Sequence, residues 1–196
     1  MLKDGKLLWS GEHWILYLRR PGEASNSASV GVYHTRFSEA GEGSVALVSI
    51  PGDPALSVAV TDSLDLHKFT MERVRAGAAD DPFNDLDLPV KEGWVYRQGD
   101  VRNSPSWIIK YHDTRIVAIW SSLMEPLIIG DLPPTVDGKV VNFSVLMFAD
   151  DSIITVDGEQ APGKVFERPG WRKITGADGP ATSCCFAIAE TYTITE

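Results

Sequence analysis

A glutamate close to the end of the sequence stands among residues that alternate in the manner of a β-strand. In the run 183–194, Glu190 shares a predicted face with Phe186, Ile188 and Tyr192. Period-two alternation of β-forming residues predicts a strand. If this face points inward, a carboxylate enters an apolar interior, where it needs a partner. Such a carboxylate can anchor a ligand or act as a general acid or base.

The same run contains the only two cysteines, Cys184 and Cys185. A disulfide between neighbouring residues strains the backbone and closes almost no loop. A metal site needs further ligands, and the segment 182–191 contains no histidine. We therefore predict two buried thiols that pack as small apolar side chains.

Other residues that could carry chemistry are scattered. Lys110, His112 and Tyr192 could join Glu190 in general acid–base chemistry, but their spacing does not bring them together, so the catalytic residues stay unknown. A metal site built from His34, His112 and a carboxylate can be drawn, as in cupin-like barrels. Those barrels carry closely spaced histidines, which this chain lacks.

Standard motifs for cofactors and metals are absent from the sequence. It has no GxxxxGK[ST] phosphate loop, no GxGxxG after a strand, no GxSxG elbow and no HExxH. The acidic segment 78–89 does not match a calcium loop, because positions three and six from Asp81 are Phe83 and Leu86. We predict no metal and no cofactor, and we expect this segment to be a solvated loop.

Aromatic residues gather in the segment 106–121. A two-residue turn at Asp113-Thr114 would place Trp107 opposite Trp120, with Tyr111 on the same apolar face. Aromatic side chains in such a position either line a pocket or fill a core, and the sequence leaves both open. We predict that the ligand-binding residues are Trp107, Tyr111, Trp120 and Glu190.

Many short apolar segments separated by Gly/Pro turn signals indicate an all-β fold. A second hairpin is expected with its turn at Asp150-Asp151. We predict strands over residues 7–10, 13–19, 29–37, 44–50, 56–61, 93–99, 106–112, 115–121, 140–149, 152–157, 164–168 and 183–194.

One prominent α-helix is predicted near 62–77, with Asp62 as its N-cap and Gly77 just after its end. Its expected buried stripe runs through Leu64, His67, Met71, Val74 and Ala78.

The predicted fold class is mainly β, an antiparallel β-barrel or β-sandwich, in a single domain over residues 1–196. The plan is similar to lipocalin-like barrels in architecture only. No lipocalin signature residues are present, and the analogy carries no function with it.

Composition limits the partners. The 196 residues carry a net charge of −9, which excludes nucleic acid and anionic membranes as expected partners. The apolar stretches are far shorter than the roughly 18–20 residues that span a bilayer. The N-terminal residues lack the apolar region of a signal peptide, so we expect a cytoplasmic protein.

Three functions remain open. The first is a small-molecule-binding β-barrel that holds an apolar or aromatic ligand in an internal cavity. The second is a cofactor-independent enzyme, an isomerase, lyase or hydrolase, that uses the same cavity. The third is a homodimeric scaffold protein. The proline-rich apolar segment 121–134 would cover the barrel mouth in the first two cases and lie at an interface in the third.

Overall fold

The computed structural model describes residues 5–75, 81–132 and 140–195. Its strands are β1 (Gly5–Leu18), β2 (Ala28–Ser38), β3 (Gly43–Ser49), β4 (Ser57–Thr61), β5 (Val90–Glu92), β6 (Trp94–Gln98), β7 (Ser106–Tyr111), β8 (Thr114–Leu123), β9 (Leu127–Leu132), β10 (Val140–Val156), β11 (Glu159–Gln160) and β12 (Cys184–Thr195). The helices are α1 (Leu64–Phe69) with a π-helical continuation over Thr70–Val74, α2 (Arg172–Thr175), and 3-10 turns at Pro54–Leu56 and Pro169–Trp171.

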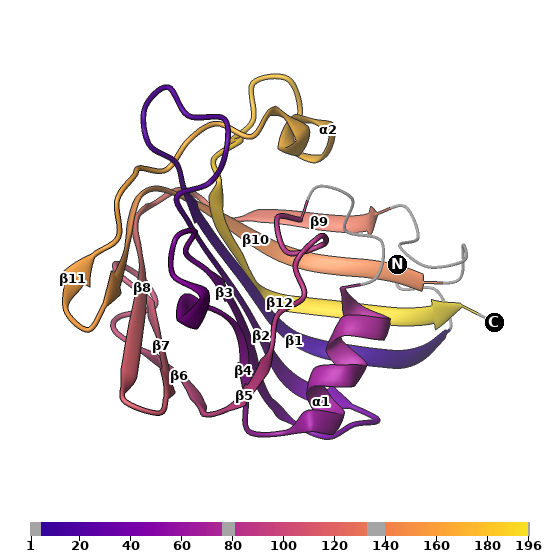
Figure 1. Ribbon diagram of the computed structural model, residues 1–196. Helices are drawn as coiled ribbons and strands as arrows, with labels where there is room; N and C mark the ends of the chain where they lie inside the picture. Colours follow the sequence, from indigo (N-terminus) through magenta and orange to yellow (C-terminus); the bar gives the residue numbers. More distant parts are fainter. Residues whose placement is uncertain (1–4, 76–80, 133–139, 196) are drawn as a thin grey trace.

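The strands form one sheet that curls into a nearly closed barrel (Figure 1). Its order is β5-β4-β3-β2-β1-β12-β10-β8-β7-β6, and β9 and β11 pair with β10. All pairs are antiparallel except β4 with β5. The structure therefore confirms the mainly β, barrel-shaped fold.

The two ends of the sheet are joined by consecutive residues of the chain. β5 pairs with β4, β6 pairs with β7, and only Gly93 separates β5 from β6. The Gly93 amide donates to the Thr61 carbonyl at 3.0 Å. A Cβ atom at Gly93 would lie 2.3 Å from the Lys110 carbonyl oxygen, so only glycine fits this close approach.

The barrel interior is filled by an aromatic core. Trp14 stacks on Phe186 at a centroid distance of 3.9 Å and meets the edges of Trp107 and Trp120 at 5.9 and 5.1 Å. Trp120 Nε1 also donates to the Ile15 carbonyl at 3.0 Å. We call this set the inner core; its larger members are Trp14, Leu16, Leu18, Trp107, Ile109, Tyr111, Ile116, Trp120, Ile154 and Phe186.

A buried carboxylate links three strands at one end of this interior. Glu12 is fully buried and accepts hydrogen bonds from Trp14 Nε1 at 3.0 Å and Arg97 Nη1 at 2.9 Å. It also pairs with Arg36. Since these residues belong to β1, β6 and β2, the cluster holds opposite walls of the barrel together.

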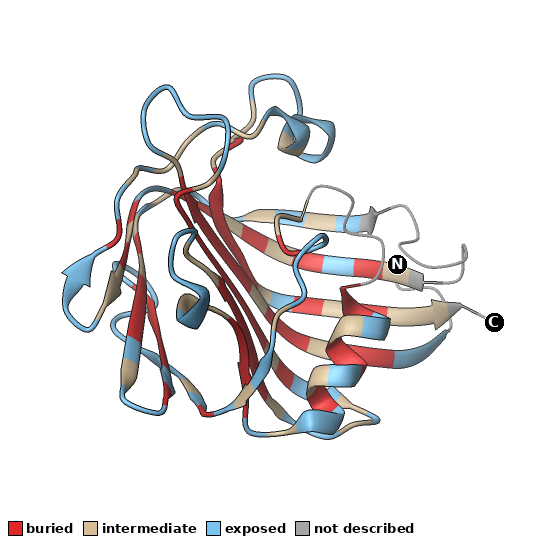
Figure 2. Cartoon of the chain, viewed as in Figure 1, coloured by how far each residue is buried: buried red, intermediate tan, exposed pale blue. Residues whose placement is uncertain are grey.

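The outer face of the sheet is buried as well (Figure 2). Helix α1 and several loops cover strands β1, β2, β3 and β12 on this side (Figure 1). We call this second set the outer core; its larger members are Trp9, Ile15, Tyr17, Tyr33, Leu47, Leu66, Phe69, Phe83, Leu146, Phe148, Cys185 and Tyr192.

The predicted helix is present, but its cap and its buried face differ from expectation. Ser63, not Asp62, is the N-cap, and its Oγ accepts from the Leu66 amide at 3.2 Å. The face that packs against the sheet contains Leu66, Phe69 and Val74 and not Leu64, which is 70% exposed; the helix continues beyond Phe69 as a π-helical turn. The expected positions Gly77 and Ala78 lie outside the described residues.

The strand predictions hold for most of the sheet, with four main differences. The segments 7–10 and 13–19 form one strand, β1, and 140–149 and 152–157 form another, β10. The segment 164–168 contributes isolated bridges, at Lys164 and Glu167, in place of a strand. Within 121–134, residues 127–132 form β9, which pairs with β10.

Both predicted hairpins need correction. The β7–β8 turn is at His112-Asp113, so Trp107 pairs with Ala118, not Trp120, although the predicted apolar face is the buried one. Such a two-residue shift of register preserves the faces. No turn occurs at Asp150-Asp151; β10 runs through it and turns at Asp157-Gly158, where both residues have positive φ.

Replacing Gly93 by alanine should weaken the barrel closure. The new Cβ would collide with the Lys110 carbonyl and Val60, so we expect a loss of about 1–3 kcal/mol in the free energy of unfolding. Gly130→Ala is the control, because its Cβ would find its nearest neighbour at 3.8 Å. Urea unfolding of both variants measures the difference, and equal stability would contradict the closure assigned to Gly93.

Removing the Glu12 carboxylate should also destabilise the fold. Glu12→Ala leaves the buried Trp14 indole without its acceptor and two arginines without their counter-charge, so we expect a loss of about 2–3 kcal/mol. Glu23→Ala removes an exposed pair with Arg20 and should cost less than about 0.5 kcal/mol. Thermal unfolding of the two variants compares them, and an equal effect would argue against a structural role for Glu12.

Candidate functional site

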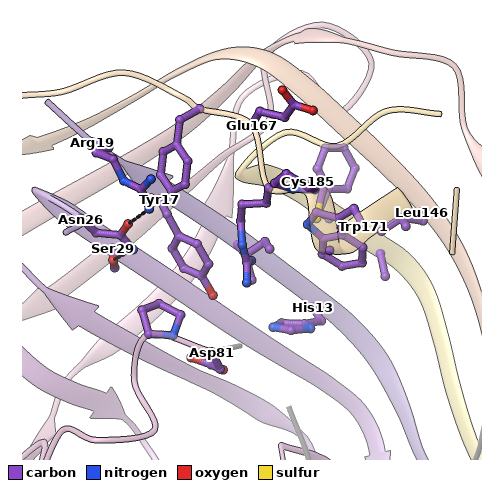
Figure 3. A pocket seen from close by; sticks show the side chains of 18 of the residues that line it. His13, Tyr17, Arg19, Asn26, Ser29, Asp81, Leu146, Glu167, Trp171 and Cys185 are labelled. Atoms are coloured by element: carbon purple, nitrogen blue, oxygen red, sulfur yellow. Dashed lines mark hydrogen bonds between the residues drawn. The ribbon is translucent and has the colours of Figure 1, made fainter. Parts of the chain in front are cut away.

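A cavity of about 1010 Å³ lies on the outer face of the sheet, outside the barrel (Figure 3). Its floor is made by Ile15 and Tyr17 of β1, Leu146 of β10, and Cys185 and Ala187 of β12. The segments 81–86 and 166–174 form part of its rim.

An irregularity in β12 places Glu190 on this floor. Between its pairs with Gly11 and His13, β12 advances three residues while β1 advances two, and it also has one residue more than β10 over the same stretch. Such a bulge exchanges the two faces of a strand. Cys184 and Phe186 therefore point into the inner core, whereas Cys185 and Glu190 belong to the outer side. The expectation that Glu190 shares a face with Phe186 is wrong for this reason.

The four residues predicted to bind ligand lie on opposite sides of the sheet. Trp107, Tyr111 and Trp120 are buried in the inner core, and Tyr111 donates its hydroxyl to the Ala55 carbonyl at 2.7 Å. Glu190 lines the outer cavity. The structure brings the three aromatic residues together but not with Glu190. Ligand binding by the three aromatic residues stays a prediction.

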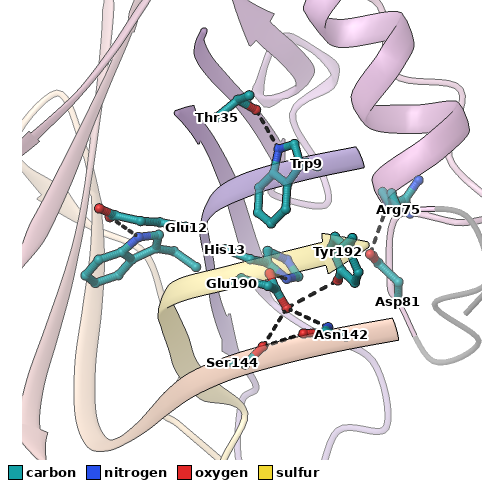
Figure 4. A network of polar contacts seen from close by, with 11 residues as sticks. Trp9, Glu12, His13, Thr35, Arg75, Asp81, Asn142, Ser144, Glu190 and Tyr192 are labelled. Carbon is teal, nitrogen blue, oxygen red and sulfur yellow. Dashed lines mark hydrogen bonds and ion pairs between the residues drawn. The ribbon is translucent and has the colours of Figure 1, made fainter. Parts of the chain in front are cut away.

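Glu190 is 7% exposed and is only half satisfied by hydrogen bonds (Figure 4). Its Oε1 lies 3.3 Å from Asn142 Nδ2, 3.3 Å from Ser144 Oγ and 3.2 Å from the Tyr192 hydroxyl. Its Oε2 has no hydrogen-bond partner among the described residues. Bonds to a carboxylate are usually shorter, about 2.7–2.9 Å. The carboxylate is therefore poorly compensated for its burial.

His13 is the ionisable side chain next to the open oxygen. Its Nδ1 lies 3.9 Å from Glu190 Oε2, and its ring stacks on Tyr33 at 4.1 Å. Burial lowers the pKa of His13; Arg75 acts in the same direction, whereas the charges of Glu190 and Asp81 oppose it. A lowered pKa leaves the imidazole largely neutral at neutral pH, so it does not balance a carboxylate charge.

Two tyrosines near Glu190 stay protonated for the same physical reason. Burial raises the pKa of Tyr33 and of Tyr192 well above the ordinary value, and the charge of Glu190 adds to both effects. The Tyr192 hydroxyl can therefore act only as a neutral donor toward Glu190.

Residues 81–89, the described part of the acidic segment, lie at one side of the cavity; residues 84–87 are exposed, as expected of a solvated loop, whereas Asp81 and Phe83 are held against the protein. Asp81 is buried and accepts from Arg75 Nε at 2.9 Å, and Arg75 also donates to Asn84 at 2.9 Å. Phe83 is buried against Tyr17 at a ring distance of 6.1 Å. Because Arg75 and Asp81 pair with each other, Arg75 is not the counter-charge of Glu190.

A second polar region of the cavity is basic. The Arg19 guanidinium lies 3.7 Å from the Phe166 ring centroid, and its Nη2 donates to Asn26 at 3.4 Å. Arg168 lies 5.1 Å from the ring centroid of Tyr17. Arg19 Nε is buried without a hydrogen-bond partner in the described structure, and so is the indole nitrogen of Trp171 on the rim.

These unpartnered atoms are concentrated at the cavity. Of the five buried side-chain nitrogen and oxygen atoms without a partner in the described part of the chain, three belong to residues that line it: Arg19, Trp171 and Glu190. Buried polar groups are normally hydrogen-bonded, so unsatisfied ones point to a missing water, ion or ligand. The cavity can accept a donor at Glu190 and an acceptor at Arg19 or Trp171.

The sequence contained a signal for part of this site. The odd positions of 13–19 are His13, Ile15, Tyr17 and Arg19, whereas the even positions between them are apolar. One face of that strand is therefore mixed, as expected for a binding surface. No comparable signal marked Trp171, which lies in the 3-10 turn Pro169–Trp171.

Both cysteines are buried and free, as predicted. Cys184 lies 2.9 Å from Ser152 Oγ in the inner core, and Cys185 lines the outer cavity. Burial raises the pKa of each thiol, which disfavours the reactive thiolate.

The structure also locates the histidines considered for a metal site. His34 is on β2 and bonds Ser44, whereas His112 is in the β7–β8 turn. Within the described residues, no cluster of three or more His, Cys, Asp or Glu side chains could hold a metal ion. Over the same ranges, no helix is both long enough and apolar enough to cross a membrane.

Comparison with known proteins gives no assignment. No protein-family model, curated protein or solved structure matches this chain. Its function must therefore be inferred from the cavity itself.

The pairing of His13 with Glu190 can be measured by titration. In an NMR titration, we expect His13 to protonate below its ordinary midpoint of about 6.5, and lower still in Glu190→Gln, because that carboxylate raises the pKa of His13. Burial alone lowers the pKa of His67, so the same variant should leave its midpoint unchanged. An unchanged or raised His13 midpoint in Glu190→Gln would contradict the contact.

The sign of the effect on stability follows from the same shift. With a pKa below that of the unfolded chain, His13 binds fewer protons in the folded state. Its contribution therefore lowers stability as the pH falls below about 6.5, and this loss continues to the lowered folded pKa.

Proposed function

We propose that the protein binds an apolar or aromatic small molecule in the cavity on the outer face of its sheet. The observation that carries this proposal is the cavity of about 1010 Å³, which combines an apolar floor with unpartnered buried polar atoms. Ligand sites are typically concave and largely apolar, with a few polar groups that fix orientation, and range over about 300–1,000 Å³.

The proposal places the ligand outside the barrel, not in an internal cavity of the lipocalin kind. Trp14, Trp107, Trp120 and Phe186 fill the interior by direct ring contacts. A ligand in that position would have to displace close-packed aromatic side chains. The outer cavity requires no such rearrangement.

A cofactor-independent enzyme that uses this cavity is a second candidate. The observation in its favour is the neighbouring pair of His13 and Glu190, whose facing atoms are 3.9 Å apart beside the cavity. A neutral imidazole and a carboxylate are both able to accept a proton from a bound substrate. This candidate predicts turnover, whereas the first predicts binding alone.

One argument for the third alternative, a homodimeric scaffold protein, no longer holds. Trp107 and Trp120 are covered within a single chain, so no second subunit is needed to bury them. Homodimer formation and a cytoplasmic location stay predictions.

The neutral fluorescent probe N-phenylnaphthylamine tests the binding site. We expect it to bind with a dissociation constant in the micromolar range, and Ala187→Phe to weaken binding at least about tenfold by filling the floor of the cavity. Fluorescence titration measures both constants. Ala189→Phe is the matched control, because Ala189 is exposed on the same strand and does not line the cavity.

Equal binding by the two phenylalanine variants would place the probe elsewhere and contradict the proposal. Absence of probe binding to the unmodified protein would contradict it as well. Thermal unfolding of each variant must show that it is folded before its affinity is compared.

A further inference from the structure

We propose that the ligand of this cavity is an organic amine, whose ammonium group binds at Glu190 Oε2 and whose apolar body lies on the floor formed by Ile15, Tyr17 and Ala187. This inference rests on the proposed binding function and specifies the chemical class of its ligand. At one end of the cavity, the buried Glu190 Oε2 has neither a hydrogen-bond donor nor an ion-paired lysine or arginine among the described residues.

Glu190 needs a donor that the described chain does not provide. Its Oε2 is buried and has no hydrogen-bond partner among the described residues, although the residue lines a large cavity. An ionised carboxylate accepts hydrogen bonds through both oxygens. A ligand with an N–H or O–H group at this point would satisfy the remaining oxygen.

The hydrogen-bond donors to the other oxygen, Oε1, do not compensate for the missing hydrogen bond at Oε2. Ser144 has one hydroxyl hydrogen, and Asn142 Oδ1 at 2.9 Å is a closer acceptor for it than Glu190 Oε1 at 3.3 Å. This leaves the Asn142 amide at 3.3 Å and the Tyr192 hydroxyl at 3.2 Å as the other donors to Oε1. Both are neutral donors at long distances, so they compensate a buried charge only weakly.

Among the described residues, no lysine or arginine forms an ion pair with Glu190. His13 is the nearest titratable base and is held largely neutral by its burial, and Arg75 is committed to Asp81 and Asn84. A positively charged donor therefore stabilises this end of the cavity more than a neutral one, because a charge-assisted hydrogen bond is roughly twice as strong.

The net charge of the chain favours the same choice. Of the carboxylates that line the cavity, Asp81 and Glu167 are paired with Arg75 and Arg172, so the local preference for a cation comes from Glu190 itself. The chain as a whole carries −9, which attracts cations over longer distances.

An anionic ligand at Arg19 is the competing possibility, and the geometry favours it less. Arg19 is half-buried, its guanidinium packs over Phe166, and one of its nitrogens already donates to Asn26. Glu190 is more deeply buried and has no charged partner closer than 3.9 Å. An unpaired charge costs more in the more buried position.

Three probes with the same apolar body, a phenyl ring on four methylene groups, test this inference: 4-phenylbutylamine, 4-phenylbutanol and 5-phenylpentanoate. Displacement of N-phenylnaphthylamine at neutral pH gives the three affinities. We expect the amine to bind at least about tenfold more tightly than the alcohol, and the carboxylate to bind most weakly. In Glu190→Gln, the ratio of amine to alcohol affinity should fall to within about twofold.

The matched control is Glu159→Gln, which makes the same change of charge at an exposed position on β11. It should keep the preference for the amine, so a loss in Glu190→Gln alone cannot result from net charge. Comparing the ratio within each variant cancels any general loss of affinity. The NMR spectrum of His13 shows whether Glu190→Gln is folded around the site, and Glu190→Asp serves as a second variant if it is not.

Three outcomes would overturn the inference while leaving the binding function intact. These are equal affinity for amine and alcohol, tightest binding of the carboxylate, and an amine preference that persists in Glu190→Gln. If neither the fluorescent probe nor any of the three compounds binds, the proposed function itself fails, and the inference fails with it.

Discussion

The central strands of this protein are buried on both faces, and the remaining features of the molecule depend on that constraint. On β1, Trp14 and Leu16 pack into the barrel while Ile15 and Tyr17 pack outward. A sheet of this kind must be covered on its outer side, because apolar surface left in water costs about 25 cal/mol per Å². Helix α1 and the segments 81–86 and 166–174 form this cover, and the cavity lies where the cover and the sheet do not meet.

The bulge in β12 gives this two-sided sheet a polar site. Without the extra residue, Glu190 would follow Phe186 into the barrel, among close-packed aromatic rings. With it, the carboxylate lies on the outer side, beside Asn142, Tyr192 and His13. The bulge in β12 thus determines whether the Glu190 carboxylate lies in the inner core or on the outer side of the sheet. This explains how a strand that reads as regularly alternating can serve both a packed core and a ligand site.

Sequence patterns predicted the β class, the helix, most strands and the buried thiols, because these depend on local periodicity and turn residues. They also predicted which face of the β7–β8 hairpin packs into the inner core, because the face of Trp107 and Tyr111 is wholly apolar whereas the opposite face carries Lys110 and Arg115. The register of that hairpin was wrong, since moving the turn by one residue leaves each face unchanged.

The site was harder to predict, because its parts come together only through long-range pairing. Glu190 was recognised as unusual, but a bulge has no signature in a strand of alternating residues, so its face was assigned wrongly. His13 on β1 and Arg19 just after it reach the same cavity as Trp171, which lies in a 3-10 turn more than a hundred residues later in the chain. Only the fold shows that they share it.

The pairing of β1 with β12 also affects how the chain can fold during its synthesis. Leu16 pairs with Cys184, so about 170 further residues must be synthesised before β12 can pair with this edge of β1. At a translation rate of about 5–20 residues per second, this edge of β1 stays unpaired for roughly 10–30 s. The sheet cannot finish its two cores before then, and contacts so distant in sequence form slowly. Newly made chains therefore expose an apolar strand edge for seconds, a state in which self-association competes with folding and chaperones can act.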